Sequence, residues 1–261
     1  MSSDSIQNAM FLAKTSSAFT IKTLGEVLQN ILTDVCFEFS SQGIKLITMD
    51  NKEPSQLMIH LNLHHNRFEK YHCDDVYNIG INLQHFHKLL KSIKKKDEIT
   101  LFIDPKHPDI LKICTETDKQ KSLDNIKIQK LEKLDIETVQ GYDKHPHIIF
   151  TSGFQKLCKN ITGINSKEVK VYTKGNYICF SAEFEGFYKR EIPFGEYDEW
   201  SEEEEYQDVF YSKSISQLTK ITGLHQKMSI YTKTDLPLKF SVDVGDLGRL
   251  DIFIKSKTQL E

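Results

Sequence analysis

Helical periodicity is confined to four short stretches of this 261-residue chain, and this scarcity limits most strongly what the chain can fold into. In each stretch apolar residues recur three or four positions apart, so that one face of a helix is apolar. The four apolar stripes consist of Leu24, Val27, Leu28, Ile31 and Leu32; of Leu83, Phe86, Leu90 and Ile93; of Phe154, Leu157, Cys158 and Ile161; and of Ile215, Leu218 and Thr222.

Most of the remaining sequence consists of short runs in which apolar and polar residues alternate, or which are rich in β-branched and aromatic residues. Such runs predict strands. Gly43, Gly175 and Gly248 separate neighbouring runs as turn residues. Few helices among many strands predict an α+β fold, in which the helices cover one face of antiparallel sheets. The predicted strands include residues 36–39, 44–48, 57–63, 99–103, 111–115, 169–173, 177–184, 228–232, 238–244 and 250–254.

The order of these elements repeats once. Residues 19–49 and 148–182 both contain a strand-like start, a short helix, a strand, a turn glycine and another strand. Residues 129–146 are rich in charge and poor in periodicity, which is typical of an exposed connector. We therefore predict two similar domains of antiparallel sheet with two helices each, at 10–128 and 147–257, joined by a connector at 129–146.

Lysines recur on the outer faces of the predicted helices. At about 100° per residue, seven lysines point away from the four apolar stripes, and Glu26 is the main acid on the same faces. Acidic residues gather instead in loops such as the run 202–205, which we interpret as solvated. The seven lysines are Lys22, Lys88, Lys91, Lys156, Lys159, Lys213 and Lys220.

Solvated helix faces often carry lysine, because lysine is a good helix former. Four lysine-bearing faces that are poor in acids favour a basic surface that binds phosphates without sequence preference. The formal net charge of −3 excludes a globally basic chain but leaves room for such a local surface. Flexible lysine stems also suit a sliding contact better than rigid arginine forks do.

The five cysteines are widely spaced and form no CxxC motif, so we expect reduced thiols of an intracellular protein and no zinc site. Residues 1–7 are polar and do not resemble a signal peptide. No stretch approaches the roughly 18 apolar residues of a membrane span. We expect no membrane association, and the composition does not separate the nucleus from the cytoplasm.

An enzyme is the first alternative, because histidines cluster in the sequence. No HExxH, P-loop or nucleophile-elbow pattern accompanies these histidines, and Asp50 and Asp74 fit turn capping better than paired catalysis. We therefore expect no catalytic residue, no metal and no cofactor. The clustered histidines are His60, His64 and His65, His85 and His87, and His145 and His147.

Four segments carry short motifs in a fixed order. Residues 28–50 include Cys36, the stretch 40–43 and a run that ends in Met49–Asp50; residues 68–91 and the C-terminal stretches 235–238 and 246–250 follow. In residues 68–91 the motif consists of Tyr71, Cys73, Asp74, Gly80, Asn82 and Leu83. By their order and spacing over residues 11–257, these motifs make the chain resemble the proliferating cell nuclear antigen family of DNA sliding clamps.

The resemblance implies a trimeric ring. Three chains of two similar domains would close head-to-tail around duplex DNA, with the helices lining the hole and the sheets forming the outer wall. The seven lysines fall on positions where the family has basic residues. The implied partners are duplex DNA, DNA polymerase and other DNA replication and repair enzymes, and a clamp loader. The implied location is a site of DNA replication in the nucleus or cytoplasm.

The resemblance also implies a pocket that receives a short client peptide as a helical turn. The matching positions are Met49, Pro54, Ile136, Pro237 and Phe253. The sequence departs from the family pattern at Glu53, Gln56, Lys255 and Ser256, and this divergence favours an origin in a large DNA virus.

Edge strands at about 122–128 and 184–192 would join neighbouring chains, by resemblance to the family. Lys119, Lys121 and Lys127 on the first segment complement Glu183, Glu185 and Glu191 on the second. The first segment also contains Asp124 and Asn125, which are poor strand formers. A processivity factor of the same fold that acts as a monomer or dimer therefore stays open as an alternative.

Overall fold

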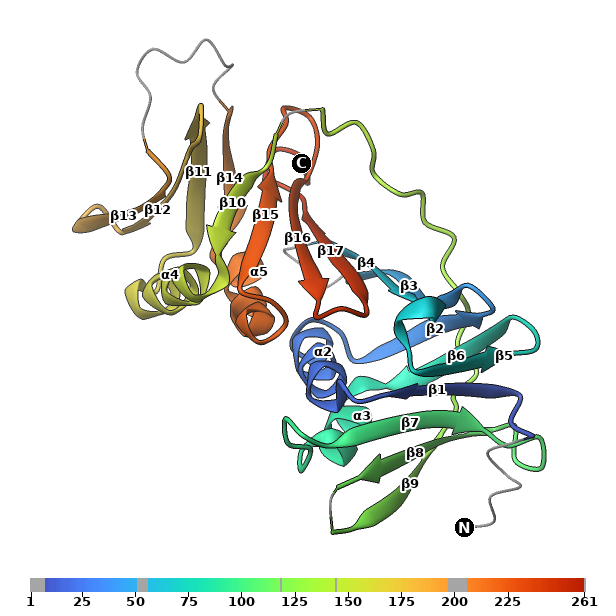
Figure 1. Cartoon of the computed structure of the whole chain (residues 1–261). Helices are drawn as coiled ribbons and strands as arrows, with labels where there is room; N and C mark the ends of the chain where they lie inside the picture. Colours follow the sequence, from blue (N-terminus) through green and yellow to red (C-terminus); the bar gives the residue numbers. More distant parts are fainter. Residues whose placement is uncertain (1–7, 51–55, 118, 144, 197–205, 261) are drawn as a thin grey trace. The chain divides into compact units, whose positions relative to one another are not determined.

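A computed structural model describes residues 8–50, 56–117, 119–143, 145–196 and 206–260 (Figure 1). The chain forms two compact units, and each is discontinuous in the sequence. Unit 1 comprises Met1–Thr48, His60–Ile136 and Asp243–Leu250; unit 2 comprises Met49–Ile59, Glu137–Val242 and Asp251–Glu261. The division into domains at 10–128 and 147–257 stays a prediction.

Unit 1 contains a five-stranded antiparallel sheet in the order β5-β1-β7-β8-β9. A second set of strands follows the order β3-β2-β6. The bounds are β1 Phe11–Thr15, β2 Asp34–Ser40, β3 Gly43–Asp50, β5 Lys70–Cys73, β6 Tyr77–Asn82, β7 Glu98–Ile103, β8 Ile110–Glu116 and β9 Lys121–Lys127. The helices are α2 Ala18–Ile31, α3 Leu83–Leu90 and the 3-10 turn η1 His65–Arg67.

The two α-helices of unit 1 pack against each other. Leu24 and Leu28 of α2 and Phe86 of α3 are buried, as their apolar stripes predict. Gly25 lies where the helices meet, because a Cβ atom there would be 3.5 Å from the Phe86 ring. The α2–α3 pair therefore buries its apolar stripes and leaves the opposite faces to polar side chains.

Unit 2 contains a four-stranded antiparallel sheet in the order β13-β12-β11-β14, and a second set in the order β10-β15-β16. Helix α4 packs against α5 and the 3-10 helix η2. The bounds are β10 His147–Phe150, α4 Thr151–Ile164, β11 Glu168–Lys174, β12 Tyr177–Phe184, β13 Tyr188–Phe194, β14 Tyr206–Tyr211, α5 Ser212–Ser216, η2 Gln217–Gly223, β15 Lys227–Tyr231 and β16 Leu238–Val244.

Four strands contribute residues to both units, namely β3, β4 (Leu57–His64), β16 and β17 (Gly248–Ile254). In unit 2, Phe154 of α4 lies 6.2 Å from the Phe180 ring and 5.3 Å from the Phe240 ring, measured between centroids. These rings anchor the apolar face of α4 in the core of its unit.

The connector begins at a close backbone contact. The N–H of Gln129 donates to Gly80 O at 2.9 Å, and a Cβ atom at position 80 would lie 2.2 Å from Gln129 O. Only glycine fits this approach. From Lys130 to Pro146 the described residues form no helix or strand, as the sequence predicted.

The α+β fold class is confirmed, and each predicted strand overlaps an observed one. The second helix ends at Leu90 with Lys91 as its C-cap, so Ile93 is buried beyond the helix instead of within it. The fourth stripe corresponds to a short α-helix followed by a 3-10 helix.

Candidate functional site

Exposed lysines mark the outer faces of the helices in unit 2. Lys156 and Lys159 on α4, Lys213 on α5 and Lys220 on η2 are all exposed. The sequences of α4, α5 and η2 contain no aspartate or glutamate. These faces therefore present positive charge without acids on the same helices.

Unit 1 presents a smaller basic face on α3. Lys88 and Lys91 are exposed, and the helix contains no acidic residue. The side chain of Asn82 caps the helix by accepting a hydrogen bond from the N–H of His85 at 3.0 Å. Lys88 lies in the last turn, where a cation interacts favourably with the helix dipole.

Lys22 differs from the expectation of an outer-face charge. Its side chain is half-buried, and its Nζ donates to Lys91 O and to Ile93 O, each at 2.8 Å. The carbonyls at the end of α3 have no partner within the helix, and the lysine stem is long enough to reach them. The Lys22 ammonium group therefore stabilises the loop after α3 by hydrogen bonds.

The predicted pocket residues fall in different parts of the chain. Met49, Pro237 and Phe253 belong to unit 2, Ile136 belongs to unit 1, and Pro54 lies outside the described residues. Met49, Ile136 and Pro237 are half-buried, whereas Phe253 is only 3% exposed.

Two tyrosines that the sequence analysis missed belong to the same aromatic cluster as Phe253. The ring of Tyr142, from the connector, lies 6.3 Å from Phe253 and 5.9 Å from Tyr231, and its hydroxyl donates to Pro237 O at 2.6 Å. Burial raises the pKa of Tyr142. Tyr231 was detectable as part of a predicted strand, whereas nothing in the irregular connector singles out Tyr142.

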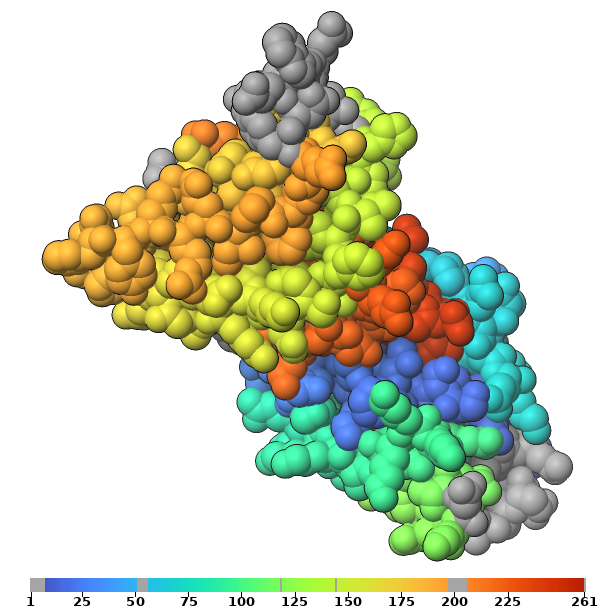
Figure 2. Space-filling view, turned by 60° about the vertical axis from the view of Figure 1, so that its left-hand side comes forward, coloured from blue at the N-terminus to red at the C-terminus, as the bar shows by residue number. Residues whose placement is uncertain are grey.

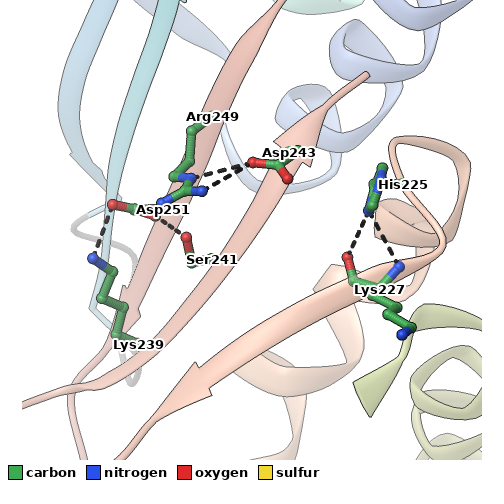
Figure 3. A network of polar contacts seen from close by, with 7 residues as sticks. All are labelled: His225, Lys227, Lys239, Ser241, Asp243, Arg249 and Asp251. Atoms are coloured by element: carbon green, nitrogen blue, oxygen red, sulfur yellow. Dashed lines mark hydrogen bonds and ion pairs between the residues drawn. The ribbon is translucent and has the colours of Figure 1, made fainter. Parts of the chain in front are cut away.

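A lysine lies among these three rings. Lys239 Nζ is 5.1 Å from the Tyr231 centroid, 5.4 Å from Phe253 and 5.8 Å from Tyr142. It also pairs with Asp251 at 3.0 Å, and Asp251 accepts a hydrogen bond from the Ser241 hydroxyl at 2.5 Å (Figure 3). The site in unit 2 thus combines aromatic rings with one cation, which forms an ion pair with a carboxylate.

Two departures from the family pattern contact each other. Lys255 Nζ donates to Gln56 Oε1 at 3.0 Å, and the Lys255 N–H donates to Gln56 O. Ser256 is buried, with its N–H donating to Gln259 Oε1 at 2.9 Å. Glu53 lies outside the described residues. The polar residues at 56 and 255 therefore act as a pair.

The predicted edge strands correspond to β9 and β13, which end their sheets. Asp124 and Asn125 lie within β9 in spite of their low strand propensity. Some of the complementary charges have partners within the chain, since Lys121 pairs with Glu116 at 3.1 Å and Glu191 with Lys189 at 2.5 Å.

Large apolar side chains are exposed near both edges. Leu123 of β9 is 42% exposed, and in the β12–β13 hairpin Phe187 is 80% and Tyr188 49% exposed. Figure 2 shows this hairpin, in yellow and orange, at the surface of unit 2. Exposed apolar groups beside an unpaired strand edge are typical of protein interfaces.

The clustered histidines and the acids do not converge on a metal. Among the described residues, no group of three or more His, Cys, Asp or Glu side chains is arranged to hold a metal ion. Asp74 accepts a hydrogen bond from the Tyr77 hydroxyl, in keeping with a turn role. All five cysteines are unpaired, and three of them are buried. Within the described part of the chain, no helix has the length and apolarity needed to cross a membrane.

Comparisons with known proteins agree with this architecture. Residues 10–139 match the family model for the N-terminal domain of proliferating cell nuclear antigen. The curated protein "Probable DNA polymerase sliding clamp 1" of Paramecium bursaria Chlorella virus 1 is 26% identical over 257 residues, which are 95% of this chain and 97% of that protein.

Two solved structures match nearly the whole chain. The Proliferating Cellular Nuclear Antigen of Entamoeba histolytica has a TM-score of 0.82 at 18% identity, covering 95% of this chain and 99% of that one. A chain of the PCNA2-PCNA3 complex of Sulfolobus tokodaii has a TM-score of 0.82 at 17% identity, covering 96% and 100%. These likenesses define the fold as that of the DNA clamps. The chain belongs to the proliferating cell nuclear antigen family.

Proposed function

We propose that this chain is a DNA sliding clamp, a non-enzymatic subunit that encircles duplex DNA and tethers DNA polymerase and other DNA enzymes to it. The observation that carries the proposal is the set of exposed lysines on α3, α4, α5 and η2, helices that contain no acidic residue. Such faces attract phosphates without reading bases, and a sliding protein needs contact of this kind.

In this proposal three copies close into a ring through β9 and β13, and their helices line the hole. The ring holds DNA by topology, while the lysines provide diffuse attraction. Because a closed ring must open to admit duplex DNA, a clamp loader is an expected partner, and the protein acts where DNA is replicated. Client enzymes attach by short peptides to the surface around Met49, Pro237 and Phe253.

Replacing Lys88, Lys91, Lys156 and Lys159 together with alanine tests this function. All four side chains are exposed, so the fold should persist while phosphate attraction falls. We expect weaker loading or sliding on DNA, a smaller salt dependence of DNA retention, and less stimulation of the polymerase.

A variant with Lys70, Lys106, Lys130 and Lys167 changed to alanine is the matched control, because it removes the same charge from exposed positions outside the four lysine-bearing helices. Circular dichroism checks that both variants are folded. Unchanged polymerase stimulation in the helix variant, or an equal loss in the control, would count against the proposed role of the helix lysines.

A further inference from the structure

A lysine-rich groove lies in unit 1, apart from the helix faces. It has a volume of about 870 Å³ and is formed by the loop 92–97 and by residues from the end of β8 to the start of β9. Among the described residues its charged side chains are Lys94, Lys95, Lys96 and Lys119 together with Asp97.

The loop that carries three of these lysines is fixed in place. Lys22 Nζ bonds to the carbonyls of Lys91 and Ile93, immediately before the lysine run. The N–H of Lys94 donates to Asp97 Oδ2 at 2.8 Å, and the N–H of Asp97 donates back to Lys94 O at 3.2 Å. Asp97 is only 7% exposed and closes this turn, so its carboxylate is turned to the loop backbone.

The three lysines of the run are themselves exposed. Lys95 Nζ lies 5.9 Å from the Phe19 ring, which guides its stem without neutralising its charge. Three adjacent ammonium groups on a fixed turn repel one another, and an anion relieves that repulsion.

The opposite wall supplies hydroxyl groups. Thr117 Oγ1 accepts hydrogen bonds from the N–H of Lys119 at 3.3 Å and of Gln120 at 3.0 Å and donates to Gln120 O at 3.0 Å, so its hydroxyl is used within the β8–β9 turn. The hydroxyls of Thr115 and Ser122 form a hydrogen bond with each other at 2.5 Å across the two strands, which leaves one O–H of the pair to donate to a ligand. The groove is thus lined by ammonium and hydroxyl groups, the same groups that contact phosphate oxygens in nucleic-acid complexes.

We propose that this groove is a second DNA-binding surface, which holds the sugar–phosphate backbone outside the set of helix lysines; the inference rests on the proposed clamp function. An acidic peptide would need apolar anchors to bind tightly, and the one large apolar side chain in the lining, Ile93, is 3% exposed.

The test changes Lys94, Lys95 and Lys96 together to glutamine. Binding of a short fluorescent DNA duplex is measured at several salt concentrations, and a variant with Lys70, Lys106 and Lys130 changed to glutamine serves as the control of equal charge. We expect the groove variant to bind about tenfold more weakly at 0.1 M salt, with the slope of log K against log[salt] flattened by about two to three. The control should change far less.

Equal behaviour of the two variants would overturn the groove assignment, because only the total charge would then matter. If the groove variant loses binding to polyglutamate but keeps binding to DNA, the groove binds an acidic peptide. If the groove variant loses self-association in sedimentation, the groove binds a second copy of the chain. Either result would overturn the assignment. If the unmodified chain shows no salt-sensitive binding to duplex DNA, the proposed function fails as well. If the helix variant binds DNA more weakly while the groove variant binds DNA as the unmodified chain does, this inference fails and the proposed function stands.

Discussion

At the scale of single residues, the aromatic site in unit 2 owes its form to contacts between residues far apart in the sequence. Tyr142 packs beside Phe253 and bonds to Pro237 O, while Lys239 and Asp251 form an ion pair next to the rings. The ion pair is mostly buried, with side-chain exposures of 19% and 16%. A client peptide would therefore meet a largely apolar surface whose one cation is already neutralised.

Changing Phe253 to leucine probes this site. Leucine retains most of the buried volume, so the fold should lose only about 1 kcal/mol, whereas the flat ring beside Tyr142 is lost. Because Phe253 is only 3% exposed, the change acts through the Tyr142 ring that packs beside it. We expect the affinity for a synthetic client peptide to fall about tenfold, with the oligomeric state unchanged. Calorimetric titration measures the affinity.

Phe240→Leu is the control, because Phe240 is 1% exposed and packs against Phe154 of α4 in the core of unit 2. It makes the same chemical change and should leave the peptide affinity intact. Identical affinity of Phe253→Leu and the unmodified chain would remove Phe253 from the site.

Sequence patterns predicted on which face of its helix each lysine lies, but not which groups its ammonium group contacts. Lys22 points away from its stripe, yet its flexible stem folds over to the carbonyls after α3. Likewise, Gln56 and Lys255 bond across 199 positions of sequence. Periodicity is a local property, so it carries no information on such distant partners.

At the scale of elements, the packing of α2 against α3 depends on the close approach at Gly25. A Cβ atom there would meet Phe86 at 3.5 Å and Leu90 at 3.8 Å, which are ordinary contact distances. The helices therefore leave room for one methyl group, beside an apolar cavity of about 40 Å³.

Gly25→Ala should therefore stabilise unit 1, by about 1 kcal/mol, since glycine costs that much relative to alanine within a helix. Thermal and urea unfolding measure the change. Gly43→Ala is the contrasting variant, because its φ is +136° and a Cβ atom would lie 2.0 Å from Leu63 O. Gly43→Ala should destabilise the protein. If Gly25→Ala also destabilises it, the contact between α2 and α3 has no room for the added methyl group.

Element type was predictable wherever the apolar pattern was strong, as in α2, α4 and the buried strands. β9 was harder to predict, because Asp124 and Asn125 disfavour strands. Pairing with β8 over seven residue pairs overrides that preference. The 3-10 form of η2 was also beyond prediction, since a short stripe fits an α-helix and a 3-10 helix almost equally well.

At the scale of the whole molecule, the proposed ring closes through β9 and β13. Both strands leave one edge without a neighbour in the described sheets, and apolar side chains are exposed near both. The two-domain division rested on the repeat of element order. That division stays a prediction, while the compact units combine segments that are distant in the sequence, which no repeat pattern could reveal.

Solution mass tests the assembly. We expect a species near three times 30.3 kDa by sedimentation or light scattering at micromolar concentration. Leu123→Lys places a charge on the free edge of β9 and should shift the population toward the monomer without unfolding it, because Leu123 is 42% exposed. A persistent monomer of the unmodified chain would instead favour the non-ring processivity factor.

The strands shared by both units have a consequence for dividing the chain. Unit 1 draws on residues 243–250 and unit 2 on residues 49–59, so the segments of the two units alternate along the sequence. No single cut in the gene would therefore yield two fragments that each contain a complete unit.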